Sequence, residues 1–138
     1  MKNLISDNSS IKDTNKTIVI DLDGTLTIES NAPYHEKIPN RQVIEVCRKY
    51  HDIGYKIVIF TARNMRTHKG DIETILADTY PIIIEWLKKN NVPYDEVVVG
   101  KPWCGEDGFY VDDKAIRPNE FVSSSVEEIK RIIQGKSK

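Results

Sequence analysis

The sequence predicts an α/β fold, in which helices and a mostly parallel sheet form three layers. Short β-branched runs such as 17–20 and 97–99 stop abruptly at acidic residues or glycine, as buried parallel strands do. They alternate with segments whose apolar residues recur at helical spacing. The 138 residues, 39% apolar and 30% charged, suit a single soluble domain. We expect this domain to span 17–135, after a flexible leader at 1–16 that is rich in Asn, Ser, Asp and Lys.

The first half of the chain is predicted to form a strand, a helix and a second strand. The run TIVI at 17–20 is the first strand, and it ends at Asp21. Asn40 is a suitable N-cap for a helix that continues to about Ile53, with Gly54 as its stop. The apolar residues of this helix recur at helical spacing, which makes Cys47 a core residue. Residues 56–60 form the second buried strand.

The second half repeats this alternation. A polar, basic loop at 62–71 precedes a helix that Thr79 could cap and that has Pro81 in its first turn. Strands are expected at 97–99 and 109–111, each followed by polar residues or glycine. A capping box is expected to begin the last helix, formed by Ser124 with Glu127 or by Ser125 with Glu128.

Charge and composition exclude several classes of partner. The formal net charge of −1 gives no global field that attracts nucleic acid or anionic lipid, so we expect neither. The apolar runs are too short to cross a bilayer, and the polar start lacks the apolar core of a signal peptide. Two cysteines without CxxC spacing indicate a reducing compartment. These features predict a cytoplasmic protein that acts on a small molecule.

Each predicted strand ends in groups that can bind a metal ion or phosphate. In order, these groups are Asp21 with Asp23, Thr61, Lys101, and Asp112 with Asp113. Because the carboxyl ends of parallel strands meet at one edge of a sheet, the groups can converge there. Carboxylate oxygens suit Mg²⁺, which bridges to phosphate oxygens. The pattern therefore predicts a magnesium-dependent site for a phosphorylated ligand.

Four segments carry a resemblance to a known family. VIDLDGTLT at 19–27, FTAR at 60–63, GKPW at 100–103 and YVDDK at 110–114 resemble, in order, the four motifs of the haloacid dehalogenase superfamily, whose fold is Rossmann-like. Within it, NAPY, FTARNM, IEWLKKNNVPYDEVVVGKPW and YVDDKAIRPNEF look like the small capsule biosynthesis phosphatases. The resemblance implies a phosphatase that forms an aspartyl-phosphate.

The same resemblance implies a role for each site residue. Asp21 is the nucleophile, and Asp23 protonates the leaving group and then activates water. An Asp at the position of Asp23 marks the phosphatases of the family. Thr61 and Lys101 donate to the phosphoryl oxygens.

The implied metal site combines residues from both ends of the chain. Mg²⁺ is held by the Asp21 side chain, the Asp23 backbone carbonyl and Asp112, with Asp113 binding either directly or through water. Further groups are candidates for substrate binding, Gly24 through a phosphate-binding nest of amides and the others through their side chains. These candidates are Gly24, Arg63, Asn64, Trp103, Lys114 and Arg117.

The chain leaves no room for a sizeable cap domain. Only residues 25–39 remain as a flap between the first strand and the first helix, so the site is open unless a second subunit of a homo-oligomer covers it. The resemblance favours a sugar or polyol phosphate of capsule or cell-surface polysaccharide biosynthesis as substrate. Two alternatives stay open: a phosphatase of nucleotides or nucleic-acid ends, and a noncatalytic binding module on the same fold.

Overall fold

The computed structural model of the chain describes residues 15–135. The chain divides between Trp103 and Cys104 into two compact units. Residues 1–14 of the predicted leader lie outside the described residues, so the leader stays a prediction. Within the described part of the chain, no helix is long and apolar enough to cross a membrane.

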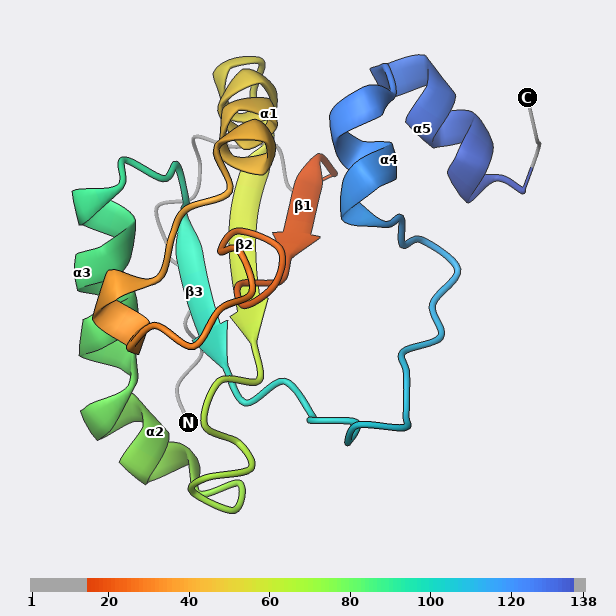
Figure 1. The fold of residues 1–138 in the computed structure, drawn as a ribbon. Coiled ribbons are helices and arrows are strands. Elements are labelled where there is room, and N and C mark those ends of the chain that lie inside the picture. Colours follow the sequence, from red (N-terminus) through yellow and green to blue (C-terminus); the bar gives the residue numbers. More distant parts are fainter. Residues whose placement is uncertain (1–14, 136–138) are drawn as a thin grey trace. The chain divides into compact units, whose positions relative to one another are not determined.

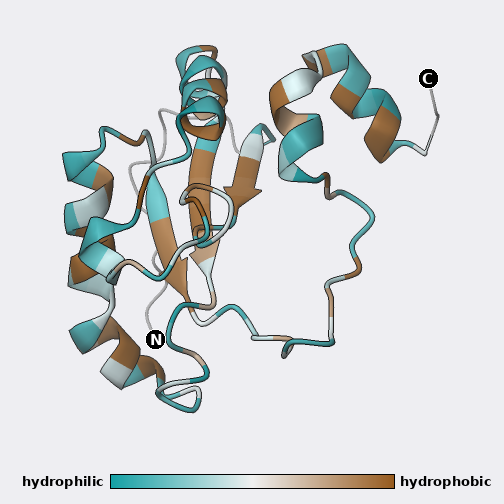
Figure 2. Ribbon diagram, viewed as in Figure 1, coloured by the Kyte–Doolittle hydropathy of each residue, from teal (hydrophilic) through white to brown (hydrophobic). Residues whose placement is uncertain are grey.

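The first unit is built on a parallel sheet with the strand order β1-β2-β3 (Figure 1). Its strands are β1 (Thr17–Ile20), β2 (Lys56–Thr61) and β3 (Glu96–Val99). Ile20 is paired with Ile59, and Thr61 with Val99, so the strands end at nearby levels. Most of the length of the strands is coloured as hydrophobic in Figure 2. The predicted α/β fold with a parallel sheet is confirmed.

Helix α1 (Arg41–Asp52) has the start that the sequence predicts. The Asn40 side chain accepts a hydrogen bond from the Val43 amide at 3.4 Å, which satisfies one of the free N–H groups of the first turn. The buried face of α1 consists of Val43, Ile44, Cys47 and Tyr50. Burial raises the pKa of the Cys47 thiol to about 12, so this cysteine remains protonated in the core.

Two helices occupy the region where the sequence predicts one. They are α2 (Ile72–Asp78) and α3 (Tyr80–Lys89), and α2 was not predicted. The predicted cap at Thr79 is wrong, because its side chain makes no capping hydrogen bond and its backbone is helical. Its hydroxyl instead accepts a hydrogen bond at 2.6 Å from the Asn64 side chain. Pro81 lies in the first turn of α3, where its missing N–H costs nothing.

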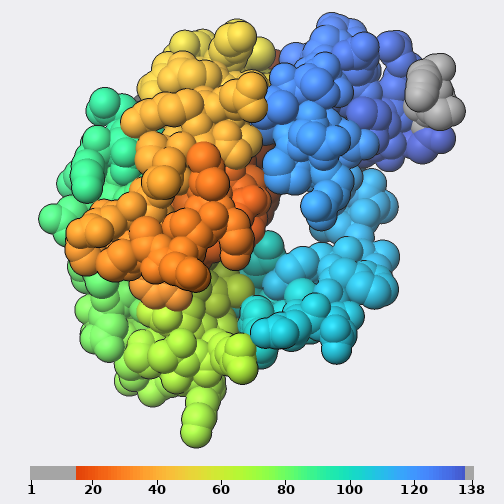
Figure 3. Space-filling view, viewed as in Figure 1, coloured from red at the N-terminus to blue at the C-terminus, as the bar shows by residue number. Residues whose placement is uncertain are grey.

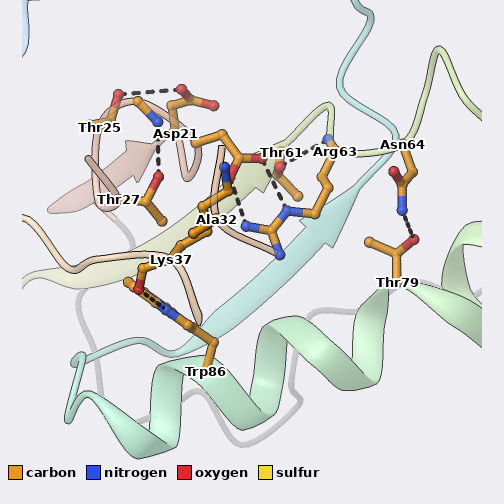
Figure 4. Close-up of polar contacts among 12 residues, drawn as sticks. Asp21, Thr25, Thr27, Ala32, Lys37, Thr61, Arg63, Asn64, Thr79 and Trp86 are labelled. Atoms are coloured by element: carbon orange, nitrogen blue, oxygen red, sulfur yellow. Dashed lines mark hydrogen bonds and ion pairs between the residues drawn. The ribbon is translucent and has the colours of Figure 1, made fainter. Parts of the chain in front are cut away.

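The flap, residues 25–39, is tied to α3. A bridge joins Thr27 to Pro39, and the flap contains the short 3₁₀ helix η2 (Tyr34–Glu36), which packs against α3. The buried Trp86 donates from Nε1 to the Lys37 carbonyl at 2.8 Å (Figure 4). Figure 3 shows the flap in orange on the surface of the first unit. A short segment therefore occupies the place where a cap domain could be inserted.

The second unit contains α4 (Pro118–Ser123), which was not predicted, and α5 (Val126–Ile133). Helix α5 begins with the capping box of Ser125 and Glu128, which decides between the two predicted alternatives.

The strand predicted at 109–111 is wrong, because these residues are irregular in the structure. Phe109 is 78% exposed and Val111 is 87% exposed. Three apolar residues next to glycine and acidic residues provide β propensity, but a strand also requires ladder pairing with a neighbouring strand.

Candidate active site at the carboxyl ends of the strands

The site begins with a tight turn at the end of β1. The Leu22 carbonyl accepts hydrogen bonds from the amides of Thr25 at 3.2 Å and Leu26 at 2.9 Å, and both leucines are fully buried. Gly24 has a φ of +81°, a conformation that favours glycine. Its amide donates to the Thr27 hydroxyl at 3.1 Å (Figure 4), so this amide serves the turn. The buried leucines leave Asp21 and Asp23, both partly exposed, on either side of Leu22.

The ends of β2 and β3 bring Thr61 and Lys101 together. The Lys101 amide donates to the Thr61 carbonyl at 3.1 Å. Between β3 and Lys101 stands Gly100, whose φ is +93°. A Cβ at this position would lie 2.9 Å from Cδ1 of Ile72, so only glycine fits without a shift of the neighbouring side chain. Lys101 Nζ then lies 3.5 Å from Asp21 Oδ1. The predicted convergence is confirmed for these three strand ends.

The Asp21 carboxylate is short of positive charge. Burial raises its pKa above the ordinary value of 3.8, whereas the Lys101 ammonium, a hydrogen bond from the Leu22 backbone amide and the Thr25 hydroxyl lower it. The two side-chain contacts are long: 3.5 Å from Lys101 Nζ to Oδ1 and 3.3 Å from Thr25 Oγ1 to Oδ2. The carboxylate therefore keeps lone pairs that a further cation or an electrophile could engage.

The Thr61 hydroxyl is oriented by the next residues of its own turn. Its oxygen accepts a hydrogen bond from the Arg63 amide at 3.0 Å (Figure 4). Because this bond occupies only a lone pair, the hydroxyl hydrogen stays available to donate to another oxygen. Thr61 is only 1% exposed, so its hydroxyl can serve only a group that reaches the strand ends.

Arg63, predicted to contact substrate, directs its guanidinium to Asp23. Nε donates to Oδ2 at 3.0 Å and Nη2 to Oδ1 at 2.7 Å, which makes a bidentate ion pair. The Arg63 side chain is 1% exposed, and its guanidinium carbon lies 4.1 Å from the centre of the Tyr34 ring. A contact of Arg63 with substrate remains untested. Tyr34 is a site residue that sequence reasoning missed.

Asn64 and Trp103 are the other two residues of the first unit that were predicted to bind substrate through their side chains. Asn64 lies in the loop after β2, and Trp103 lies after β3. Asn64 has a φ of +63°, a left-handed conformation that Asn tolerates, and its side chain donates to Thr79. Trp103 is 45% exposed, and the guanidinium of Arg66 lies 5.0 Å from its ring centre. The basic loop that carries Arg66 is part of the surface in Figure 3. Trp103 thus presents an aromatic face close to Lys101 in the chain.

The remaining predicted residues belong to the second unit. Asp112, Asp113, Lys114 and Arg117 are all exposed there. Asp112 Oδ1 accepts a hydrogen bond at 2.8 Å from the Lys114 amide, which closes a turn. The Arg117 amide donates to the Glu120 side chain at 2.9 Å, at the start of α4. Their predicted roles in metal and substrate binding stay predictions.

Asp21 is a carboxylate of the first unit with the chemistry of a metal ligand. Among residues 15–135, no group of three or more His, Cys, Asp or Glu side chains is placed to hold a metal ion. The chemistry of Asp21 nevertheless fits Mg²⁺, because its oxygens are hard donors and burial leaves the carboxylate in need of positive charge.

Comparisons with known proteins agree with this geometry. A family model for haloacid dehalogenase-like hydrolases matches residues 18–85. The crystal structure of a structural-genomics target from Vibrio cholerae is 53% identical over 87% of this chain and 98% of its own, with a TM-score of 0.85. The chain belongs to the haloacid dehalogenase-like hydrolase family. The family match includes Asp21, Asp23 and Thr61, and the likeness to the Vibrio cholerae protein shows that this Rossmann-like fold exists without a large cap.

Two more distant likenesses concern much longer proteins. The carbamoyl phosphate synthase large chain of Clostridium botulinum (strain Loch Maree / Type A3) is 28% identical over 145 aligned residues, which include 99% of this chain. This chain spans only 12% of the length of that relative. A chain of the Pnkp1/Rnl/Hen1 RNA repair complex is 22% identical over 94% of this chain and 37% of its own, with a TM-score of 0.47.

Proposed function

We propose that the chain is a magnesium-dependent phosphomonoester hydrolase that works through an aspartyl-phosphate on Asp21. The observation that carries the proposal is the Asp21 carboxylate at the end of β1, with Lys101 Nζ 3.5 Å from Oδ1. A carboxylate beside a cation can attack phosphorus while the cation neutralises the oxygens of the transferred group. Membership of the hydrolase family supports this reading of the site.

In the first step, an Asp21 oxygen forms a bond to phosphorus as the bond to the leaving oxygen breaks in line. Asp23 gives its proton to the leaving oxygen, which departs as an alcohol. The Lys101 ammonium and the Thr61 hydroxyl donate to the phosphoryl oxygens, where negative charge is greatest. The product is an acyl phosphate on Asp21.

In the second step, water attacks the phosphorus of the aspartyl-phosphate. Asp23, now a carboxylate, accepts a proton from this water, and the bond between phosphorus and Asp21 breaks. Inorganic phosphate leaves, Asp21 is again a carboxylate, and Asp23 again carries a proton. Each residue thus returns to its starting state.

Magnesium would be held by the Asp21 carboxylate, the Asp23 backbone carbonyl and Asp112, with Asp113 bound either directly or through water. When bound, the ion neutralises charge on the phosphoryl oxygens and helps to orient them. The need of the Asp21 carboxylate for positive charge supports this assignment.

The substrate that we propose is a sugar or polyol phosphate of capsule or cell-surface polysaccharide biosynthesis, in the cytoplasm. The resemblance of the sequence to the small capsule biosynthesis phosphatases supports it. The flap is short, so a bulky carbohydrate could reach Asp21, and a second copy of the chain could cover the site. The net charge of −1 favours a carbohydrate over a nucleic-acid end.

The hydrolysis of an aryl phosphate tests the reaction class. We expect activity with Mg²⁺, loss of activity with EDTA, and loss in Asp21→Asn. The matched control is Asp52→Asn, which changes an exposed aspartate at the end of α1 and should keep full activity. Activity that survives in Asp21→Asn would refute the mechanism. A wild-type chain that binds sugar phosphates without hydrolysing them would support a noncatalytic module.

The identity of the leaving group needs a second experiment. A panel of sugar, polyol and nucleotide monophosphates at equal concentration would be compared by kcat/KM. We expect the highest values among the sugar and polyol phosphates. A preference of more than about tenfold for nucleotides, equivalent to about 1.4 kcal/mol of transition-state binding, would favour the alternative substrate.

A further inference from the structure

Arg63 and Asp23 form a bidentate ion pair. Both Asp23 oxygens accept hydrogen bonds from one guanidinium, at 2.7 and 3.0 Å. Figure 4 marks these hydrogen bonds of the Arg63 guanidinium as dashed lines. Such a pair fixes the plane of the carboxylate as well as its position, which a lysine cannot do.

The surroundings of Arg63 favour a partner inside the protein. The Asp23 side chain is 37% exposed, whereas the Arg63 side chain is 1% exposed. Tyr34 lies over the guanidinium at 4.1 Å, and Nη1 is buried without a hydrogen-bond partner among the described residues. Two of the three guanidinium nitrogens thus bind Asp23, and the ring of Tyr34 covers the guanidinium.

The flap holds the tyrosine in this position. Tyr34 begins η2, which packs against α3. The next residue after η2 is Lys37, whose carbonyl accepts the hydrogen bond from Trp86. Trp86 of α3 thus contacts the flap at Lys37, and Tyr34 of the same flap contacts Arg63, which binds Asp23.

We propose that Arg63 is a positioning residue for Asp23 and that Tyr34 of the flap keeps Arg63 in place. This inference rests on the proposed function, in which Asp23 exchanges protons. An Asp23 carboxylate held by two hydrogen bonds keeps its remaining lone pairs in fixed directions. One of these lone pairs can accept the proton of the attacking water without a change of the Asp23 rotamer. The ion pair therefore acts mainly in the second step, the hydrolysis of the aspartyl-phosphate.

The first test compares Arg63→Gln with the wild type on an aryl phosphate, whose leaving group departs readily without a proton. We expect kcat to fall about tenfold to a hundredfold and KM to fall in parallel, with kcat/KM changed by less than about threefold, because only hydrolysis of the intermediate is slowed. A burst of the aryl alcohol approaching one equivalent per chain should precede the slow turnover. A large rise in KM with unchanged kcat would instead show that Arg63 binds substrate and would overturn the proposal.

A double-mutant cycle distinguishes positioning from a general structural role. If Arg63 acts through Asp23, Arg63→Gln should cost less than about twofold once Asp23→Asn is present. Losses that multiply in the double variant would overturn the proposal. Arg63→Lys should restore only part of the activity, because an ammonium cannot bind both carboxylate oxygens in the same plane. The matched control is Arg131→Gln on α5, which changes an exposed arginine and should leave kcat unchanged.

Tyr34 provides a test that does not depend on the folding of the arginine variants. Tyr34→Leu removes the aromatic face and should lower kcat in the same direction as Arg63→Gln, by a smaller factor. Tyr34→Phe keeps the ring and should retain the wild-type kcat. Equal losses in both tyrosine variants would overturn the role of the ring face.

The wild-type chain separates the two proposals. If it shows no Asp21-dependent hydrolysis, the proposed function fails and the inference fails with it. If the wild-type chain is active and folded Arg63→Gln has the same kcat without a burst, only the inference fails.

Discussion

The replacement of Lys101 by methionine removes the cation next to the proposed nucleophile. Lys101 Nζ is 3.5 Å from Asp21 Oδ1, and methionine preserves most of the length of the side chain without the charge. The loss of one group that stabilises charge in the transition state costs about 10²-fold to 10³-fold in kcat, or about 3 to 4 kcal/mol. We expect an activity loss of this size.

The effect on stability should be much smaller. The Lys101 and Asp21 side chains are 20% and 35% exposed, so solvent screens their attraction and the pair contributes at most about 1 kcal/mol. For a chain of this length, 1 kcal/mol corresponds to about 3 °C in the midpoint of thermal unfolding. The contrast between a large loss of rate and a small loss of stability identifies Lys101 as a functional group.

The pH dependence has a definite sign. The attack requires ionised Asp21, so activity is present above the pKa of Asp21 and is lost as the pH falls through it. Burial raises the pKa of Asp21 and Lys101 opposes this rise. Removal of Lys101 therefore raises the pKa further and moves the acidic limb of the rate profile to higher pH.

The assay measures kcat and kcat/KM of aryl phosphate hydrolysis from acidic to neutral pH at constant, saturating Mg²⁺, together with thermal unfolding. The reasoning would be refuted if Lys101→Met kept more than about a third of the wild-type kcat, a difference of under about 1 kcal/mol. A shift of the acidic limb to lower pH would refute the electrostatic part alone.

Two further predictions concern stability. Burial raises the pKa of folded Asp21 above 3.8, so protonation contributes stability that is fully present below the unfolded pKa and is lost as the pH rises through the folded value. Without Mg²⁺, Asp21→Asn should therefore raise the thermal midpoint at pH 7 and lose this advantage in acid, and a lower midpoint at pH 7 would contradict the prediction. Trp86→Phe removes the 2.8 Å bond to the Lys37 carbonyl and should lower the unfolding free energy in urea by about 1 to 2 kcal/mol. Trp103→Phe, a change at a 45% exposed ring, is the control and should alter it by less than about 0.5 kcal/mol.

The elements that could be predicted from sequence were those with both a periodic pattern and a local signal. Helix α1 has four buried residues at helical spacing and the Asn40 cap, and the short strands β1 and β3 end sharply at Asp21 and Gly100. Helix α2 was missed because Asp71 makes no side-chain cap and its seven residues bury only Ile75. The failed strand at 109–111 had the apolar run but could not reveal a pairing partner, which is a non-local property.

Some positions in the candidate site could also be predicted from the sequence, and others could not. We predicted from the sequence that Asp21, Thr61 and Lys101 lie close together, because the ends of parallel strands meet at one edge of the sheet. The partner of Arg63 could not be predicted, since the pairing with Asp23 spans 40 residues and depends on a flap without periodic pattern. The sequence contains Tyr34 within NAPY, yet only the tie between Trp86 and the flap explains its place over a buried guanidinium.

The two carboxylates of the site are held in different ways, and the difference matches their proposed roles. Asp21 faces the Lys101 ammonium at 3.5 Å, a flexible point charge that stabilises the anion without occupying all its lone pairs. Asp23 lies in the rigid fork of Arg63, which restricts its orientation. A nucleophile must approach phosphorus and form a bond, so it needs freedom along that path. A proton acceptor must present one lone pair in one direction, so it gains from being fixed. An exchange of the two cations, lysine for Arg63 and arginine for Lys101, should therefore impair both steps even though the total charge of the site is unchanged.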